Sequence, residues 1–263
     1  LQQVASDWHA VADRQFRLRF FHWHAWFDAW LGTLETEPDA VRFFTLYRDD
    51  VPLAVVPLKS ERRRVLGMPV RSLRLPRHAH MPVGDMICAA RIDPAEVLHA
   101  LTGFLAAQRE AWDVIELAPL LEESPTVAVL AQLPGIVHVT REKTCDQLEC
   151  AGDFDSIKSR FSKNFRSNLN KARNKLAKRE NVRMTSVSGN GQLQPAFEDF
   201  LALEASGWKG AAGAGTAIAL HPELIDFYQA LIDKLADQVV INSLHVDGEL
   251  IAAQFCVRTE AVL

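Results

Sequence analysis

Apolar residues recur at every third or fourth position between Ser156 and Arg183, which is the spacing of one face of an α-helix. The successive steps are 4, 4, 4, 3 and 4 residues. The positions are Ile157, Phe161, Phe165, Leu169, Ala172 and Leu176. This pattern predicts one long amphipathic helix whose apolar stripe is buried against a sheet or a neighbouring helix.

Two other stretches show strand-like runs that flank a short polar turn. Asp49-Asp50 joins such runs in the first half of the chain, and Asp247-Gly248 joins them in the second. An Asp-Gly pair between apolar runs is among the strongest short-range signals of a tight β-hairpin. We therefore expect a β-hairpin in each half.

The remaining patterns predict further helices and strands. Phe20–Leu34 places Trp23, Trp26, Phe27 and Trp30 on one helical face, which we interpret as core rather than as a cofactor surface. We expect other helices over Asp93–Ala111, from Ser124, over Phe197–Ser206 and from Pro222, and strands over Arg62–Leu66, Val70–Leu75, Asp113–Leu117, Val137–Glu149 and Val182–Val187. Strands that alternate with helices in this way predict a mixed α/β fold.

The two hairpins also predict an internal repeat. Leu46–Lys59 aligns with Leu244–Val257 without a gap, and an amphipathic helix precedes each hairpin. We therefore expect two copies of one α/β unit in tandem, at residues 1–150 and 151–263. The chain starts at Leu1 and ends in a strand-like run, so we expect a fragment whose second copy is incomplete at its C-terminus.

Composition sets broad limits on the kind of protein. The 263 residues are 48% hydrophobic and 24% charged, which is ordinary for a globular protein long enough for two domains. No apolar run approaches the roughly 18 residues of a membrane-spanning helix. The four cysteines show no metal-ligand spacing, so we expect reduced thiols and a cytoplasmic protein without a metal.

Charge is concentrated in the predicted long helix. Residues 158–183 contain ten Lys and Arg residues and one acidic residue, Glu180, so they carry +9 in a chain whose net charge is −4. Like charges at i and i+4, such as Lys171 and Lys175, disfavour an isolated helix. This pattern favours a phosphate-bearing ligand over a merely solvated helix face.

Several runs together resemble a known family. They are HWHAWFDAW, FRSNLNKARNKLAKRENVR, LALEASGWKG and LHVDGELIAAQF. Their order and spacing resemble the acetyltransferase-like proteins associated with bacterial exopolysaccharide and cellulose synthesis. These proteins are members of the GNAT acyltransferase superfamily and relatives of the Fem-type peptidoglycan bridge transferases. The resemblance runs from about residue 20 to the end of the chain and is densest over Phe161–Phe255.

The resemblance implies tandem GNAT-like domains and an acyltransferase. Such an enzyme moves an acyl group, typically acetyl from acetyl-CoA, to an amine or hydroxyl of a sugar or cell-envelope precursor. Its partners would be a saccharide or small-molecule acceptor and other proteins of polysaccharide synthesis. One departure matters: the Q/R-x-x-G-x-G/A loop that holds the CoA pyrophosphate is absent from residues 60–95.

Acyl transfer needs a base to deprotonate the acceptor, and two residues are candidates. Glu204 precedes the turn Gly207–Gly210 near the end of a predicted helix, and His221 precedes Pro222. For each, a purely structural role is at least as good an interpretation: a surface carboxylate for Glu204 and a neighbour of a helix cap for His221.

Four further residues are candidates for binding. Trp208 could pack under the acceptor or the acyl chain, and Lys209 could contact a phosphate or another anion. Arg166 and Arg173 are two helical turns apart, which suits them to hold the phosphates of the donor. The Gly-rich run Gly210–Ala217 precedes the hairpin, so we interpret it as a flexible loop rather than as the pyrophosphate cradle.

Three alternatives remain open from the residues alone. A Fem-like transferase that uses aminoacyl-tRNA fits the basic helix equally well. A nucleic-acid-binding module would use that helix as a phosphate-binding surface, although the net charge is −4. A non-catalytic scaffold would explain the missing loop. No HExxH, GxSxG or Walker sequence is present, which argues against metalloproteases, serine hydrolases and NTPases.

Overall fold

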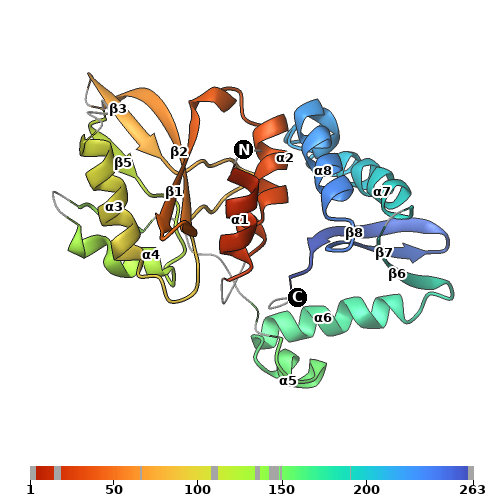
Figure 1. The fold of residues 1–263 in the computed structure, drawn as a ribbon. Coiled ribbons are helices and arrows are strands. Elements are labelled where there is room, and N and C mark those ends of the chain that lie inside the picture. The colour runs from red at the N-terminus through yellow and green to blue at the C-terminus, as the bar shows by residue number, and fades with distance from the viewer. Residues whose placement is uncertain are drawn as a thin grey trace. The chain divides into compact units, whose positions relative to one another are not determined.

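The computed structural model describes residues 4–14, 19–65, 67–107, 112–133, 137–141, 148, 150–189 and 191–259. The chain packs into two compact units. The first unit comprises residues 1–139, 221–235 and 257–263, and the second comprises residues 140–220 and 236–256. The predicted mixed α/β fold is confirmed (Figure 1). The domains predicted at 1–150 and 151–263 stay a proposal.

A five-stranded sheet forms the centre of the first unit. Its main path runs β1 (Val41–Arg48), β2 (Val51–Val65), β3 (Met68–Arg74) and β5 (Val114–Glu116), and the short β4 (Ile87–Cys88) pairs with β2. β1, β2 and β3 are antiparallel neighbours, whereas β5 runs parallel to β3. A parallel pair needs a crossover connection, and α3 (Pro94–Ala107) lies in that connection.

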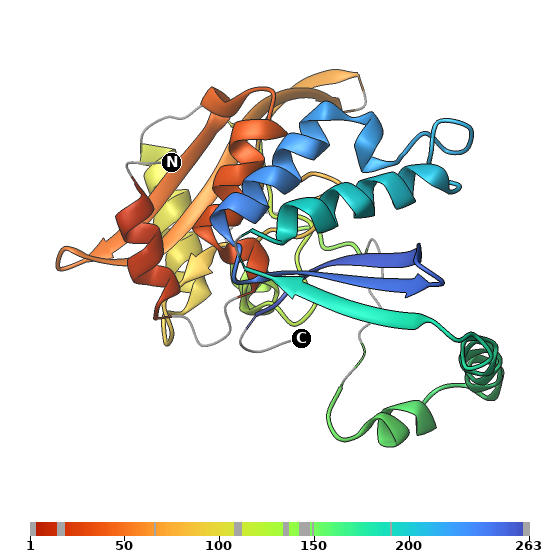
Figure 2. The same ribbon diagram turned by 90° about the vertical axis from the view of Figure 1, so that its right-hand side faces the viewer.

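Helices cover both faces of this sheet. α1 (Ala5–Ala12) and α2 (His24–Thr33) lie on one face, and α3 and α4 (Pro125–Val129) lie on the other (Figures 1 and 2). Adjacent residues of β1 show the alternation. Phe43 contacts Trp8 and Phe27 on the α1–α2 side, whereas Phe44 contacts Phe104 of α3. Short 3-10 turns lie at Phe20–His22, Pro38–Ala40 and Leu130–Gln132.

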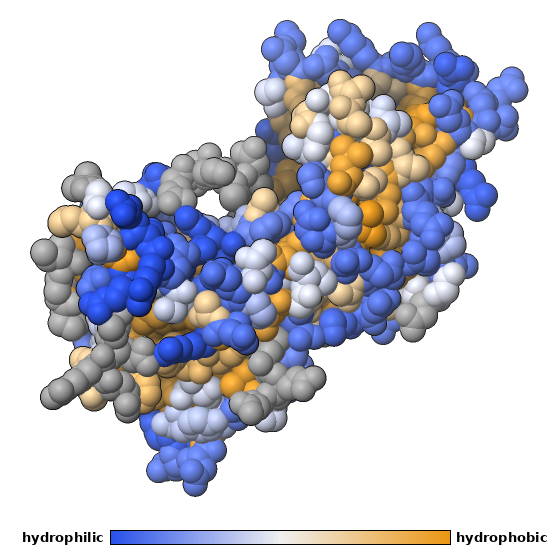
Figure 3. All heavy atoms as spheres, turned by 90° about the horizontal axis from the view of Figure 1, so that it is seen from above, coloured by the Kyte–Doolittle hydropathy of each residue, from blue (hydrophilic) through white to orange (hydrophobic). Residues whose placement is uncertain are grey.

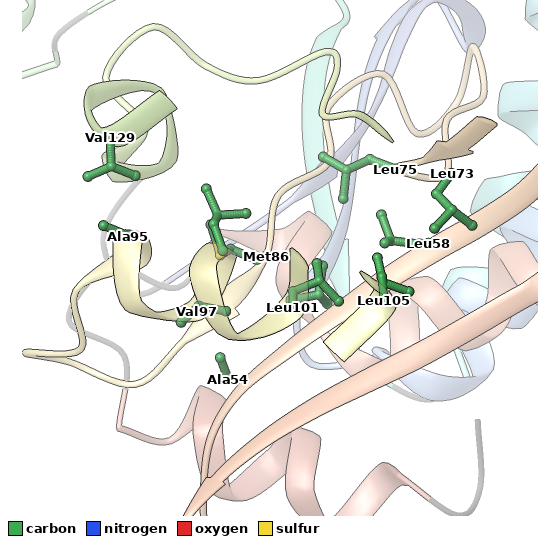
Figure 4. Packing of buried hydrophobic residues seen from close by; sticks show 12 residues of the cluster. Ala54, Leu58, Leu73, Leu75, Met86, Ala95, Val97, Leu101, Leu105 and Val129 are labelled. Carbon is green, nitrogen blue, oxygen red and sulfur yellow. The ribbon is translucent and has the colours of Figure 1, made fainter. Parts of the chain in front are cut away.

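The α3 side of the sheet holds an apolar cluster of the first unit. β2 contributes Ala54, Val56 and Leu58 at every second position, because alternate residues of a strand share one face. α3 contributes Val97, Leu98, Leu101 and Leu105 at helical spacing, as the close view shows for most of them (Figure 4). Pro94 starts α3, and the Ser124 hydroxyl caps α4 by accepting from the Thr126 amide.

The helix predicted over Phe20–Leu34 is shorter in the structure, because α2 begins at His24, and Trp23 lies before it and is only partly buried. The other three predicted core aromatics are core. Trp26, Phe27 and Trp30 of α2 are buried. α8 (Pro222–Lys234) also packs against α2, and it belongs to the first unit although it lies far along the chain. The Trp26 and Phe227 rings lie 5.6 Å apart, and Lys234 Nζ lies 2.7 Å from Asp28 Oδ2.

The second unit contains a three-stranded sheet in the order β6 (Val182–Ser188), β7 (Val239–Val246) and β8 (Glu249–Val257). α7 (Leu193–Ser206) packs on one face, with the Phe197 and Phe255 rings 6.0 Å apart. α6 (Lys163–Leu176) lies on the opposite side of the sheet from α7 (Figures 1 and 2). The remaining helical elements of the unit are α5 (Phe154–Ser159) and a 3-10 turn at Ile218–Leu220.

Both predicted hairpins are confirmed, and their turns share one geometry. Asp49 and Asp50 have φ values of 50° and 61°, and Asp247 and Gly248 have values of 54° and 87°. Positive φ at both central residues is the type I′ turn, whose twist suits two-residue hairpins. The helix before each hairpin is also present, as α2 and α8. The wider repeat stays a prediction.

Several predictions about local structure are wrong. The strand expected over Arg62–Leu66 is not separate, because it is the end of β2 (Val51–Val65). The single helix over Ser156–Arg183 is two helices, because Ser162 interrupts it and caps α6 by accepting from the Phe165 amide at 3.2 Å. The predicted apolar stripe is not buried: α6 has no buried residue, and Phe165 is 54% exposed. The strand expected over Val137–Glu149 is not formed at 137–141 or 148, and the rest of it lies outside the described residues.

Candidate active site

Glu204 lies near the end of α7 and fixes the loop that follows. Its Oε1 accepts a hydrogen bond from Lys209 Nζ at 2.7 Å, and its Oε2 accepts one from the Ile218 amide at 2.9 Å. The Glu204 side chain is only 10% exposed. One carboxylate therefore ties together the two ends of the segment from Gly207 to Leu220.

The loop itself is closed by backbone hydrogen bonds. The Ala214 amide donates to Trp208 O at 2.7 Å, and the Thr216 and Ala217 amides both donate to Lys209 O at 2.9 Å. The flexible loop that the sequence predicted is therefore wrong as a description of this segment, which is a folded turn. The prediction failed because glycine and alanine content indicates backbone freedom but not the bonds that remove it.

Two of the glycines are required by close backbone contacts. A Cβ at Gly210 would lie 1.9 Å from Ala205 O, and a Cβ at Gly213 would lie 2.0 Å from Trp208 O. Both distances are far below any real contact of a Cβ atom. The GWKGAAGAG run thus permits the chain to fold back closely on the end of α7.

Trp208 projects from this fixed loop into solvent. Trp208 is 74% exposed, and Lys209 Nζ lies 5.9 Å from the centroid of the indole ring. An indole held at the surface offers a flat apolar face, and a neighbouring ammonium offers a charge. The structure therefore brings together three of the residues predicted from sequence: Glu204, Trp208 and Lys209.

His221 lies in the first unit rather than with Glu204. It occupies the position before Pro222 at the start of α8, where its carbonyl accepts from the Leu224 amide at 2.9 Å. Its Nδ1 lies 3.7 Å from Glu223 Oε1. These contacts are those of a residue that caps a helix.

Arg166 and Arg173 lie on α6, on the other side of the three-stranded sheet from α7 (Figures 1 and 2). Arg166 Nη1 donates to Ser159 O at 2.7 Å, which joins α6 to the end of α5. Arg173 is exposed in the last turn of α6. Among the described residues, no hydrogen bond or salt bridge joins either arginine to the Glu204 loop.

The structure reveals a histidine pair that the sequence analysis did not single out. His78 and His80 follow β3 in the first unit, with ring centroids 5.7 Å apart, and His80 Nδ1 lies 2.8 Å from the hydroxyl of Tyr228. Burial lowers the pKa of His78, although Glu223 and Glu35 act in the opposite direction. The His-x-His spacing was visible in the sequence, but Tyr228 is 148 residues away and could not have been paired with it.

The same connection lacks a phosphate cradle. Residues 75–93 link β3 to α3, and they contain one glycine, Gly84, where a Cβ would lie 3.4 Å from Pro76 O. Instead, Asp85 accepts from the hydroxyls of Ser124 and Thr126 at 2.5 and 2.6 Å. Burial raises the pKa of Asp85, and the hydrogen bonds that it accepts counter this effect. The connection from β3 to α3, all of which the structure describes, therefore does not offer the glycine-rich turn that typically holds a CoA pyrophosphate.

A second buried charge in the first unit is paired. Lys59 Nζ lies 2.5 Å from Glu35 Oε1, and both side chains are almost completely buried. Burial alone would raise the pKa of Glu35, but the hydrogen bonds from Lys59 and the Glu37 amide outweigh it and lower the pKa. This pair joins the end of α2 to β2 and leaves neither group free for chemistry.

The described ranges contain no group of three or more His, Cys, Asp or Glu side chains arranged to hold a metal ion. Among the same residues, no helix combines the length and the apolar character that crossing a membrane requires.

Comparison with known proteins locates one family in the chain. Residues 163–263 match the sequence model of the acetyltransferase (GNAT) domain. No curated protein matches the chain. The matched region contains α6, β6, α7, the segment from Gly207 to Leu220 (the Trp208 loop), α8 and the second hairpin. The C-terminal part of the chain therefore carries a GNAT acetyltransferase domain at residues 163–263.

Proposed function

We propose that this protein transfers an acetyl group from acetyl-CoA to an amine or hydroxyl of a saccharide or another cell-envelope precursor. The observation that carries the proposal is the acetyltransferase (GNAT) match over residues 163–263, which supports acyl transfer in general. The choice of a saccharide acceptor rests on the exposed indole of Trp208, because an aromatic face suits the apolar face of a sugar ring.

The loop that carries Trp208 is the proposed acceptor side of the site. Lys209, beside the indole, suits an anionic group on the acceptor, such as a carboxylate or phosphate. Rigid placement of this loop by Glu204 is an advantage, because an acceptor must be held at a fixed position relative to the thioester. Transfer then forms a bond from the acceptor N or O to the acetyl carbon, breaks the C–S bond and releases CoA as the thiol.

The acceptor also has to lose a proton. Glu204 and His221 remain the proposed bases, but the hydrogen bonds from Lys209 and the Ile218 amide stabilise the ionised Glu204 carboxylate and so make it a weaker base. The geometry favours Glu204 as a residue that positions the loop. His221 would need a donor and an acceptor that reach the start of α8.

For the donor, we propose that Arg166 and Arg173 hold phosphates, as their spacing on α6 suggests. Neutralising both with Arg166→Ala and Arg173→Ala should raise the KM for acetyl-CoA about tenfold or more and leave kcat nearly unchanged, because phosphate contacts remote from the thioester bind ground and transition states alike. An unchanged KM would remove α6 from donor binding.

A ligand screen tests the function itself. Thermal-shift measurements with acetyl-CoA, longer acyl-CoAs, free CoA and aminoacyl-tRNA compare the donor classes directly, because a ligand that binds only the folded chain raises its melting temperature. Acetyl-CoA should raise it, and Trp208→Ala should weaken the binding of amino-sugar acceptors. A shift with aminoacyl-tRNA alone would favour the Fem-like alternative, and no shift with any donor would favour a scaffold.

A further inference from the structure

The helices α5 and α6 carry an apolar surface that the described part of the chain covers only partly: Phe165 and Ala172 are exposed, and Leu169 and Leu176 are half-buried. Phe165, Leu169, Ala172 and Leu176 follow one another at i, i+4, i+7 and i+11, so they form one stripe along α6. None of them is buried, and Phe165 is 54% exposed. Phe154 on α5 is 55% exposed. A surface view shows that hydrophilic residues cover much of the protein, with apolar residues exposed among them (Figure 3).

Basic side chains flank this stripe on both sides. At about 100° per residue, Arg166 and Arg173 fall on one flank of the α6 stripe, and Lys171 and Lys175 fall toward the other. The structure gives no salt bridge to Arg173, Lys171 or Lys175 within the ranges that it describes. The helix is thus amphipathic with an excess of positive charge, and no salt bridge among the described residues neutralises these three side chains.

We propose that α6 binds to the surface of an anionic phospholipid bilayer, lying in the plane of the headgroups. Its 14 residues span about 21 Å, and both features of the helix would then have a partner. The apolar stripe would enter the boundary between headgroups and acyl chains, while lysines and arginines reach the lipid phosphates with extended side chains.

Lipid fits these two features better than nucleic acid does. A phosphate backbone would pair with the basic flanks but would leave Phe165, Leu169 and Leu176 in water. An anionic bilayer satisfies the charge and the stripe together. Arg166 and Arg173 are also the residues proposed for the donor phosphates, so the test of this inference uses Lys171 and Lys175, which the proposed acyl transfer does not involve.

Vesicle co-sedimentation tests the proposal on the full chain. Vesicles of phosphatidylcholine alone are compared with vesicles that contain about 30% phosphatidylglycerol, at low and high salt. We expect binding at least tenfold tighter to the anionic vesicles, weakening as salt screens the charges. Binding to neither kind of vesicle, or equal binding to both, would overturn the proposal.

Two pairs of variants separate the charge from the stripe. Lys171→Gln with Lys175→Gln removes two positive charges, and Phe165→Ser with Leu169→Ser removes apolar side chains. Each pair should lower vesicle affinity at least fivefold. All four residues are at least partly exposed, so the fold should survive, which circular dichroism checks.

Matched controls come from the first unit. Arg62→Gln with Arg64→Gln changes the net charge equally, and Met68→Ser with Phe104→Ser removes two exposed apolar residues; both pairs should bind as the parent chain does. If the Phe165 and Leu169 variant also binds as the parent does, the stripe does not enter the bilayer and the proposal fails. Tight binding of tRNA in place of vesicles would likewise overturn it.

Discussion

Replacement of Glu204 distinguishes a residue that holds the Trp208 loop from a residue that takes a proton. Glu204→Ala removes the acceptors for both Lys209 Nζ and the Ile218 amide. Glu204→Gln keeps an oxygen that can accept from the Ile218 amide but removes the negative charge beside Lys209. The two variants therefore remove different parts of the same contact.

The structure sets the size of each effect. The pair with Lys209 is partly exposed, with the lysine side chain 42% accessible, so its loss should cost at most about 1 kcal/mol. The bond from the Ile218 amide reaches a charged acceptor beside a buried residue, and its loss should cost about 2 kcal/mol. Glu204→Ala loses both contacts and should then raise the population of the open loop by roughly 30- to 150-fold, whereas Glu204→Gln should raise it by about fivefold or less.

Amide hydrogen exchange and transfer kinetics measure the two roles separately. The Thr216 and Ala217 amides bond to Lys209 O, so their exchange reports loop opening. If Glu204 only positions the loop, Glu204→Gln keeps most activity and Glu204→Ala loses it in proportion to opening. If Glu204 is the base, Glu204→Gln loses about 100-fold or more in kcat while exchange stays near that of the parent.

Glu198 is the matched control, because it lies on α7 and pairs with Gln194, away from the loop. Glu198→Ala should change neither exchange nor kcat. Unchanged exchange of the loop amides in Glu204→Ala would refute the role of Glu204 in holding the loop.

Two further predictions concern stability. Burial, with a contribution from Arg19, lowers the pKa of His22 from 6.5 to about 4, so at acid pH the unfolded chain binds a proton that the folded chain does not. The free energy of unfolding should therefore fall by about 2–3 kcal/mol as pH drops from about 6.5 to about 4.5. Urea unfolding followed by Trp fluorescence measures this fall, and His22→Leu should remove most of it. Gly213→Ala should destabilise the Trp208 loop by about 1–3 kcal/mol or more, because its Cβ would lie 2.0 Å from Trp208 O. Gly32→Ala is the control: its Cβ would have no atom within 4 Å, so this substitution should be neutral or stabilising. Equal effects of the two substitutions on the melting temperature would contradict this account.

The sequence predicted best those elements that are determined by neighbouring residues. The type I′ turns at Asp49-Asp50 and Asp247-Gly248 follow from backbone preferences of two residues each, and both were predicted at the right positions. The apolar face of α2 was also correct for Trp26, Phe27 and Trp30, because three large aromatics in one helix have few alternatives to a core. The periodicity over Lys163–Leu176 correctly predicted a helix. It did not predict what covers the apolar stripe, because an amphipathic pattern shows that a helix has an apolar face but not what packs on that face.

Features that join distant residues were out of reach. His80 meets Tyr228 across 148 residues, and the pairing of Glu204 with the Ile218 amide requires a loop whose closure depends on close approach at Gly210 and Gly213. The sequence did place Glu204, Trp208 and Lys209 within five positions, so their proximity was predictable. Their geometry was not, because glycine content alone does not distinguish a tight turn from a flexible one.

The place of α8 leads to a prediction about the GNAT domain itself. α8 lies within the matched region 163–263, yet it packs in the first unit against α2. Leu224, Phe227 and Leu231 form its buried face, and Phe227 and Leu231 are fully inaccessible. A fragment of residues 163–263 would lack α2 and would expose this face to water, at about 1.5–3 kcal/mol for each of these side chains.

We therefore expect the fragment 163–263 to aggregate or to lack a cooperative thermal transition, although it contains the whole matched region. Phe227→Ala in the full chain should cost about 3–5 kcal/mol for the same reason, since it empties the contact with Trp26. Calorimetry and size-exclusion chromatography of the fragment, the variant and the parent chain measure both effects. A monomeric fragment with a cooperative transition would show that α8 folds without α2, and the packing of these two helices would then stabilise the first unit alone.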